Sequence, residues 1–280
     1  MDAEAVLQQA MELGEDGEWE EMARLLTEHT RGQDEPDPYL LCWLGVAERE
    51  LGNETAAYEA FKQCLAAEPV DPHLLAMAGS GLAAYHDADA EPALRAAALT
   101  GPDLAFTRLQ YGSYLAREGL FTEALEHLQA AVRLEPEDPG ALSELAIAYA
   151  LKGDHARAAV SMERTLELAP DDSWTRLLLG LVYLELEEWE QAAEALLQAA
   201  TERAEDGEAQ LLAALAAAAV GWSDAAQDVL ARAEYAGEGV DPELVADVEE
   251  AVEAGEAQAR ELLLDSLAPA ALHERLAQPL

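Results

Sequence analysis

The chain has 280 residues, and its 57 Asp and Glu against 16 Lys and Arg give a formal net charge of −41. A charge of this sign repels phosphate groups, which argues against binding nucleic acid or an anionic membrane over a wide surface. Hydrophobic residues make up 51% of the chain, yet only 6% are aromatic, and much of the rest is Ala. Because Ala is the best helix former and strands favour β-branched and aromatic residues, the composition predicts an all-α protein.

The cysteine content and the apolar runs bear on the cellular compartment. Cys42 and Cys64 are too few for a disulfide framework in a chain of this length. The first residues show neither the basic nor the apolar region of a secretory signal. The longest apolar run, residues 211–220, is too short to span a bilayer. We therefore expect a cytoplasmic protein without membrane insertion.

Acidic helix-start signals recur along the chain. Asp precedes Pro at four places, where Asp can cap the free N–H groups of a helix and Pro fits its first turn. With other acidic residues at equivalent places, they form the series Asp37, Asp71, Asp103, Asp138, Asp172, Asp206 and Asp241. Glycines fall near the middle of most intervals, at Gly52, Gly119, Gly153, Gly221 and Gly255. A period of about 34 residues with a central turn predicts a solenoid of antiparallel helix pairs.

The repeat resembles the tetratricopeptide repeat, whose consensus has Leu-Gly, Tyr, a central Gly, two Ala, an aromatic residue and a closing Pro. Residues 139–172 match it well, with Leu142, Leu145, Ala146, Tyr149, Gly153, Ala158, Met162 and Pro170. The resemblance covers essentially the whole chain and implies a right-handed α-solenoid of about seven to eight helix pairs. The expected single domain, 1–280, divides into a degenerate N-terminal cap repeat 3–36, repeats 38–71, 72–104, 105–138, 139–172, 173–206 and 207–240, and a degenerate C-terminal cap 241–280.

No pattern of catalytic or metal-binding residues emerges from the sequence. The six histidines are scattered, and the acidic run of residues 86–89 is typical of a helix cap as well as of a metal loop. Gly79-Ser80-Gly81 lacks the spacing of a nucleophile elbow. We expect a protein that is not an enzyme and has no metal or cofactor.

The resemblance also implies a binding surface. In the family, the first helices of successive repeats line a concave groove, and fixed positions of each repeat face the ligand. Carried over to this sequence, the protein-binding positions are Tyr39, Val46, Arg49, His73, Phe106, Leu109, Ser113, Arg117, Ile147, Trp174, Leu177, Leu181 and Leu184. These positions carry few charges in a strongly charged chain, which favours a binding site.

One stripe of this expected groove has two interpretations. Trp174, Leu177, Leu181 and Leu184 recur at the spacing of a single helix face. Such a face binds a partner, or it packs in the core or beneath a helix folded into the groove. The C-terminal segment around residues 272–276 is one candidate for such a helix.

The expected function is a non-catalytic scaffold or adaptor that binds another protein. Arg49 and Arg117 are the only basic groove positions, too few for the carboxylate clamp that some tetratricopeptide modules use. The expected ligand is an apolar or amphipathic segment whose basic flanks the acidic rim attracts. Two alternatives stay open: a chaperone for a secreted or assembling client, and a regulatory subunit of a separate enzyme. The acidity itself fits a salt-loving or high-GC source organism as well as a basic partner.

The net charge predicts a salt dependence of stability. Uncompensated negative charges repel one another, and salt shortens the range of that repulsion to about 8 Å at physiological ionic strength. The melting temperature should therefore rise as salt increases from about 0.05 M to about 2 M. Circular dichroism melts would test this, and a flat or falling melting temperature would show that native ion pairs outweigh the repulsion.

Overall fold

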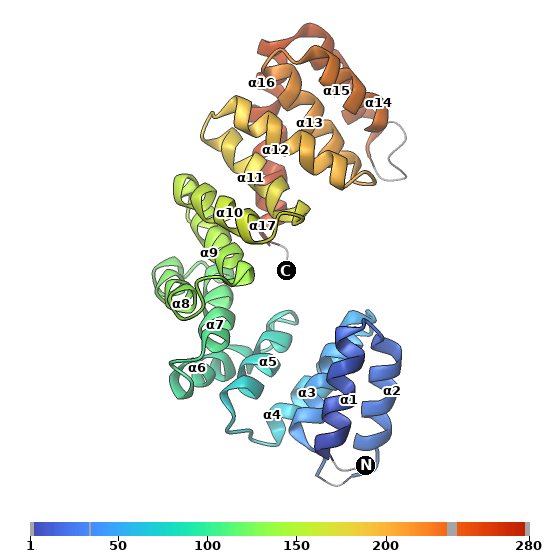
Figure 1. Ribbon diagram of the computed structural model, residues 1–280, viewed down its shortest axis with the longest axis vertical. Helices are drawn as coiled ribbons and strands as arrows, with labels where there is room; N and C mark the ends of the chain where they lie inside the picture. The colour runs from blue at the N-terminus through green and yellow to red at the C-terminus, as the bar shows by residue number, and fades with distance from the viewer. Residues whose placement is uncertain (1–2, 34, 234–239, 278–280) are drawn as a thin grey trace. The chain divides into compact units, whose positions relative to one another are not determined.

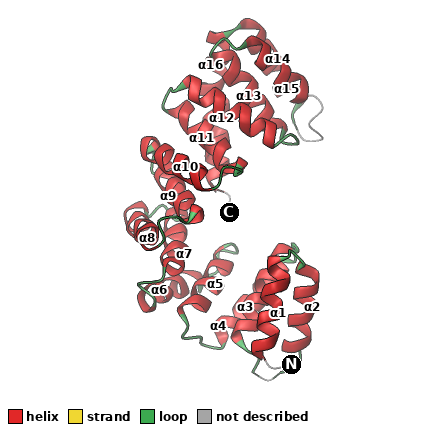
Figure 2. Cartoon of the chain, viewed as in Figure 1, coloured by secondary structure: helices red, strands yellow, loops and turns green. Residues whose placement is uncertain are grey.

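The computed structural model describes residues 3–33, 35–233 and 240–277. Every regular element within these ranges is helical, as Figure 2 shows, so the prediction of an all-α protein is confirmed. Contacts along the chain divide it into two compact units, Met1–Glu135 and Pro136–Leu280. The boundary lies at the junction of the expected repeats 105–138 and 139–172, and the single continuous domain stays a prediction.

Unit 1 is built from antiparallel helix pairs (Figure 1). Its helices are α1 (Ala3–Glu15), α2 (Trp19–Thr30), α3 (Pro38–Glu50), α4 (Glu54–Ala66), α5 (Pro72–Ala83), α6 (Ala90–Thr100), α7 (Ala105–Arg117) and α8 (Phe121–Leu134). The two helices of each pair pack together, and each second helix packs on the first helix of the next pair. The first helices α1, α3, α5 and α7 also contact one another in succession, so they form one continuous layer.

Unit 2 continues the pattern and then departs from it. Its helices are α9 (Pro139–Leu151), α10 (His155–Leu168), α11 (Ser173–Glu185), α12 (Trp189–Glu202), α13 (Gly207–Ala219), α14 (Ser223–Ala233), α15 (Pro242–Ala254), α16 (Glu256–Leu262), the π-helical stretch η1 (Leu263–Leu267) and α17 (Ala268–Ala277). From α9 to α14 the helices pair as in unit 1.

The C-terminal cap differs from the expected helix pair with a short final helix. Residues 256–277 are helical without interruption through α16, η1 and α17, and we call them the C-terminal run. In Figure 1 this run, in red, turns back along the preceding repeats. Its α16 and η1 contact α13, and its α17 contacts α11 and α9. The run therefore lies on first helices of unit 2 rather than only closing its end.

The helix starts follow the acidic signals in the sequence, with one exception. The side chains of Asp37, Asp71, Asp138 and Asp241 each accept the backbone N–H two residues on, at 2.7–2.9 Å, with Pro in the first turn. Asp103 was expected to start a helix and does not. Helix α7 begins at Ala105, its N-cap residue is Leu104, and no side chain caps it. Buried Thr107 instead donates its hydroxyl to the carbonyl of Gly101 at 2.7 Å.

Small residues let paired helices approach closely. A Cβ added at Gly45 of α3 would lie 2.7 Å from Phe61 Cδ1 of α4, and a Cβ at Gly81 of α5 would lie closer still to the opposite edge of that ring. A Cβ at Gly180 of α11 would lie 2.6 Å from Leu196 Cγ of α12. Phe61 is fully buried. It therefore fills the space between two repeats and cannot move aside.

A substitution at Gly45 tests this packing. Gly45→Ala should destabilise the fold by about 1–3 kcal/mol, because overpacking against the held Phe61 ring outweighs the gain in helix propensity of about 1 kcal/mol. Gly140→Ala is the matched control, since an added Cβ there meets only Asp138 Oδ1 at 3.3 Å. It should be neutral or stabilising in urea unfolding. Equal effects of the two substitutions would contradict the close approach of α3 and α4.

Candidate protein-binding surfaces

In unit 1, most of the expected groove residues are accessible. Tyr39, Arg49 and His73 are exposed, and Val46, Phe106, Leu109 and Arg117 are half-buried. They belong to the first helices α3, α5 and α7, which contact one another in succession. Ser113 is the exception, because it is only 8% exposed. Its contact with a ligand stays a prediction.

Aromatic side chains connect three successive first helices of unit 1. The Tyr39 hydroxyl donates to Asp71 Oδ2 at 2.6 Å, and Asp71 in turn caps α5 through the N–H of His73. The rings of His73 and Phe106 stack with centroids 5.3 Å apart. The hydrogen bond to Asp71, with some burial, raises the pKa of Tyr39 to about 12, and the same bond lowers the pKa of Asp71. These contacts hold the rings in place at the surface.

The two arginines of this surface are engaged within their own helices. Arg49 pairs with the neighbouring Glu50 at 3.5 Å, and both side chains are exposed. Arg117 Nη1 donates to the carbonyl of Ser113 at 3.3 Å. An exposed ion pair of this kind contributes about 0–1 kcal/mol. The arginines therefore do not form a cluster that would bind an acidic tail.

In unit 2, the expected groove residues are buried. Leu177, Leu181 and Leu184 have no exposed surface, and Ile147 is 2% exposed. They present no surface to a partner in this structure, as in the second of the two interpretations of this stripe, and their contact with a partner stays a prediction. Trp174 is half-buried, with the Arg203 guanidinium 5.4 Å from its ring centroid.

The pattern of burial shows that both sides of these helices are covered. Every residue from 177 to 182 of α11 and from 141 to 150 of α9 is buried. A helix with only one covered side keeps a polar, exposed face, so burial all round requires a layer on each side. Helices α10 and α12 pack on α11 within the repeats, and α17 packs on it as well. The C-terminal run is therefore the second covering layer.

Helix α17 is amphipathic, and its apolar side is the buried one. Ala268, Ala271, Leu272 and Leu276 are at most 5% exposed, whereas Ala270, His273 and Glu274 are exposed. Arg275 is only 7% exposed, and its Nη2 donates to Glu208 Oε2 of α13 at 2.8 Å. The same atom lies 3.8 Å from Asp206 Oδ1.

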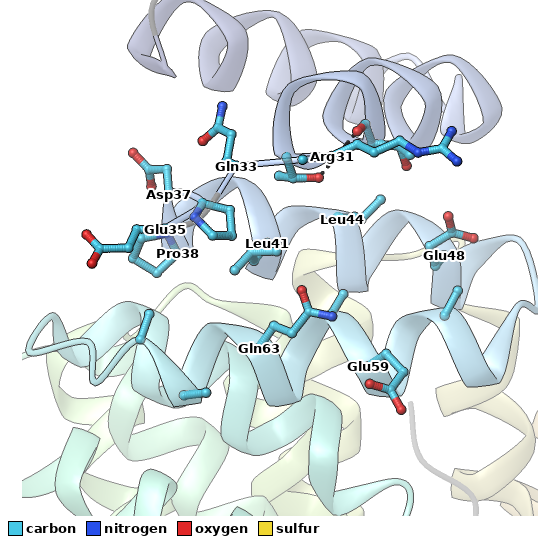
Figure 3. A pocket seen from close by; sticks show the side chains of 18 residues that line it. Arg31, Gln33, Glu35, Asp37, Pro38, Leu41, Leu44, Glu48, Glu59 and Gln63 are labelled. Atoms are coloured by element: carbon cyan, nitrogen blue, oxygen red, sulfur yellow. Dashed lines mark hydrogen bonds between the residues drawn. The ribbon is translucent and has the colours of Figure 1, made fainter.

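Unit 1 also contains an open cavity of about 1180 Å³ between α2, α3 and α4 (Figure 3). Leu41 and Leu44 of α3 line it, and acidic residues lie at both ends, with Glu35 and Asp37 at one and Glu48 and Glu59 at the other. This cavity was not expected from the sequence, because it depends on the path of the loop between α2 and α3. No spacing in the sequence predicts that path.

The acidic run of residues 86–89 is held by a lysine. Lys62 Nζ lies 3.1 Å from Asp87 Oδ1 and 2.6 Å from Asp89 Oδ2, and the Tyr58 hydroxyl donates to Asp87 at 2.8 Å. Hydrogen bonds from the Asp89 N–H and from Tyr58 lower the pKa of Asp87. Within the described ranges, no group of three or more His, Cys, Asp or Glu side chains is placed to hold a metal ion. Cys42 and Cys64 are free and buried.

The comparisons with known proteins concern the repeats themselves. Sequence models of one family, described as tetratricopeptide repeat, match residues 38–71, 105–148 and 150–218, together about half of the chain. The chain belongs to the tetratricopeptide repeat family. The structure agrees with these matches, because the matched residues form helix pairs with small residues at their contacts.

Curated relatives share short stretches with this family member. Cellulose synthase operon protein C of Escherichia coli K12 is 39% identical over 80 residues, which is 27% of this chain and 7% of that protein. Human cilia- and flagella-associated protein 70 is 35% identical over 82 residues, which is 28% of this chain and 7% of that protein. The matches thus span less than a tenth of the length of these relatives.

Solved structures of other proteins share the fold. The structure of the APC/C hetero-tetramer Cut9–Hcn1 matches with a TM-score of 0.70 at 18% identity, over 90% of this chain and 49% of the other. PilW, a type IV pilus biogenesis factor, matches with a TM-score of 0.61 at 20% identity, over 71% of this chain and 92% of PilW. Identity at this level shows the shared fold alone.

Among the described helices, none is long and apolar enough to cross a membrane.

The burial of α11 predicts the effect of a charge at its centre. Leu181→Asp should lower the free energy of unfolding by several kcal/mol, on the order of 3–5, because the carboxylate would be buried without a partner. Val160→Asp on α10 is the control, because Val160 is 65% exposed and its replacement should change stability by less than about 0.5 kcal/mol. If the two variants melted alike, Leu181 would lie on an open surface.

Proposed function

We propose that this protein is a non-catalytic scaffold or adaptor, and that unit 1 binds an apolar or amphipathic segment of a partner protein. The supporting observation is a set of accessible residues on its layer of first helices: Tyr39, Val46, His73, Phe106 and Leu109, which we call the open strip. An apolar surface that the chain's own helices leave accessible favours a protein contact. Tyr and Phe suit this role because each removes a large apolar area from water.

The charge around the open strip indicates the kind of partner. The strip itself carries no carboxylate, while the chain as a whole carries −41. Such a surface attracts basic groups over a distance and disfavours acidic ones. Arg49, the basic residue nearest in sequence to Val46, is already paired with Glu50. The ligand that fits is an apolar or amphipathic segment flanked by Lys or Arg, bound as a helix or as an extended peptide.

The two alternative roles use the same surface and differ in their consequences. A chaperone would suppress aggregation of its client, whereas an adaptor forms a defined stoichiometric complex. A regulatory subunit would change the rate of a separate enzyme on binding. The cytoplasmic location stays a prediction, as does the absence of catalytic activity in the chain.

A selection from random peptides tests this proposal, because it does not require the partner to be identified first. The purified full chain would be presented with a display library of random peptides, and the enriched sequences would be synthesised and titrated. We expect peptides that combine apolar residues with Lys or Arg, and their binding should weaken at least tenfold, about 1.4 kcal/mol, in Leu109→Asp. Leu99→Asp is the matched control, because Leu99 lies on α6, a second helix, and is 71% exposed.

The outcome that contradicts the proposal is equally specific. Enrichment of acidic peptides, or equal weakening by both substitutions, would show that the open strip is not the ligand surface. Circular dichroism melts of the two variants would establish that each is folded before binding is compared.

A further inference from the structure

We propose that the face formed by α9, α11 and α13 in unit 2 is a second helix-binding site, which α17 occupies within the chain and from which a partner helix displaces it. The partner helix carries an apolar stripe and an arginine at the position equivalent to Arg275. This inference rests on the proposed function and extends it, since it names a second site on first helices, its ligand chemistry and its regulation.

The burial of the ligand-facing positions supports an occupied site. The family resemblance places six apolar residues of three successive repeats at these positions, and each is at most 2% exposed: Ile147, Leu177, Leu181, Leu184, Leu211 and Leu215. In unit 1, the larger apolar side chains at equivalent positions, Val46 and Leu109, are half-buried, although the small side chain of Ser113 is buried there too. In unit 2, the C-terminal run contacts α13 through α16 and η1, and α11 and α9 through α17.

Helix α17 is buried on one side only, as a helical ligand in a groove is. Its buried residues Ala268, Ala271, Leu272 and Leu276 recur at intervals of one helical turn, while Ala270 and Glu274 on the other side are exposed. Anchors at such spacing characterise an amphipathic helix that lays its apolar face into a groove. The spacing of the buried apolar residues in α17 is thus the spacing that a competing partner helix would carry.

Arg275 supplies the polar part of the recognition. Its guanidinium lies between Glu208 Oε2 at 2.8 Å and Asp206 Oδ1 at 3.8 Å, at the start of α13. Charge-assisted hydrogen bonds of this type are stronger than neutral ones and fix orientation. In a chain of net charge −41, they also favour a basic incoming helix.

One donor of α17 itself stays unpaired in the docked state. The Arg275 Nε is buried, and it finds no hydrogen-bond acceptor in the part of the chain that the structure describes. A buried donor without a partner retains its desolvation cost, which weakens the intramolecular contact relative to a fully paired one. A partner helix whose own polar groups are all paired in the site would compete effectively with α17.

The C-terminal run contains a place where α17 can separate while α16 stays docked. Arg260 of α16 donates to the Ala219 carbonyl at 2.8 Å and lies 4.8 Å from the Trp189 ring centroid. Beyond it, η1 replaces the regular α-helical hydrogen bonds, and Pro269 has no N–H to donate. Displacement of α17 therefore breaks its own contacts with α9, α11 and Glu208 and bends the backbone at this irregular junction, while α16 stays docked.

A matched pair of variants in the full chain tests the proposal. Ala271→Asp places a charge on the buried side of α17, and Ala270→Asp places the same charge on its exposed side. The probe is a fluorescent peptide of the chain's own residues 263–277, titrated by fluorescence anisotropy. We expect Ala271→Asp to bind it at least tenfold more tightly than the wild type or Ala270→Asp, because α17 competes within the chain in the latter two. A peptide carrying Arg275→Glu should bind the Ala271→Asp chain at least tenfold more weakly.

Hydrogen exchange of the wild-type chain keeps the proposal falsifiable if Ala271→Asp fails to fold. The α17 amides should exchange through an opening that leaves α9, α11 and α13 protected. Exchange of α17 only together with α11 would overturn the proposal, as would a folded Ala271→Asp chain that does not bind the peptide. Dimers formed by exchanged C-terminal runs would overturn the assignment of a partner helix. None of these readouts involves the open strip of unit 1, so failure here and failure of the peptide selection are distinguishable.

Discussion

The close approach of paired helices is the constraint on which the rest of this structure depends. Within their pairs, Gly45 leaves room for the Phe61 ring and Gly180 for Leu196, and Gly81 leaves room for the same Phe61 ring from the next pair. Each pair is then thin enough for its second helix to pack on the next first helix, and in unit 1 the first helices contact one another as a layer. A larger residue at any of these glycines would separate the helices and break the layer that forms the candidate binding surfaces.

The first helices of the two units present their apolar side chains in different ways. In unit 1, aromatic and aliphatic side chains of the layer stay accessible, and the contacts of Tyr39 with Asp71 and of His73 with Phe106 hold them in place. In unit 2, the equivalent side chains are covered by the C-terminal run, with Arg275 bound to Glu208. Burying an apolar surface away from water is favourable. In unit 2 a helix of the same chain covers that surface, whereas in unit 1 the surface stays available.

The sequence predicts the helix pairs well because their signals are local. An Asp before a Pro caps the helix that follows it, as Asp37 and Asp138 do, whatever the distant parts of the chain contribute. Asp103 does not cap α7, because Leu104 lies between it and the first helical residue, Ala105, and Thr107 makes a hydrogen bond to Gly101 instead. The stripe around Leu181 could not be assigned from the sequence, since its spacing is the same whether a partner or α17 covers it. That choice depends on a contact between residues far apart in the chain.

A double-mutant cycle on Arg275 and Glu208 tests most directly whether the C-terminal run lies in the groove of unit 2. Free energies of unfolding would be measured for Arg275→Glu, Glu208→Arg and the double variant in the full chain. The account predicts that each single variant is destabilised and that the double variant recovers part of the loss, with a coupling energy of about 1–3 kcal/mol. Additive effects, with a coupling energy near zero, would contradict the docking of α17 on α13 and α11.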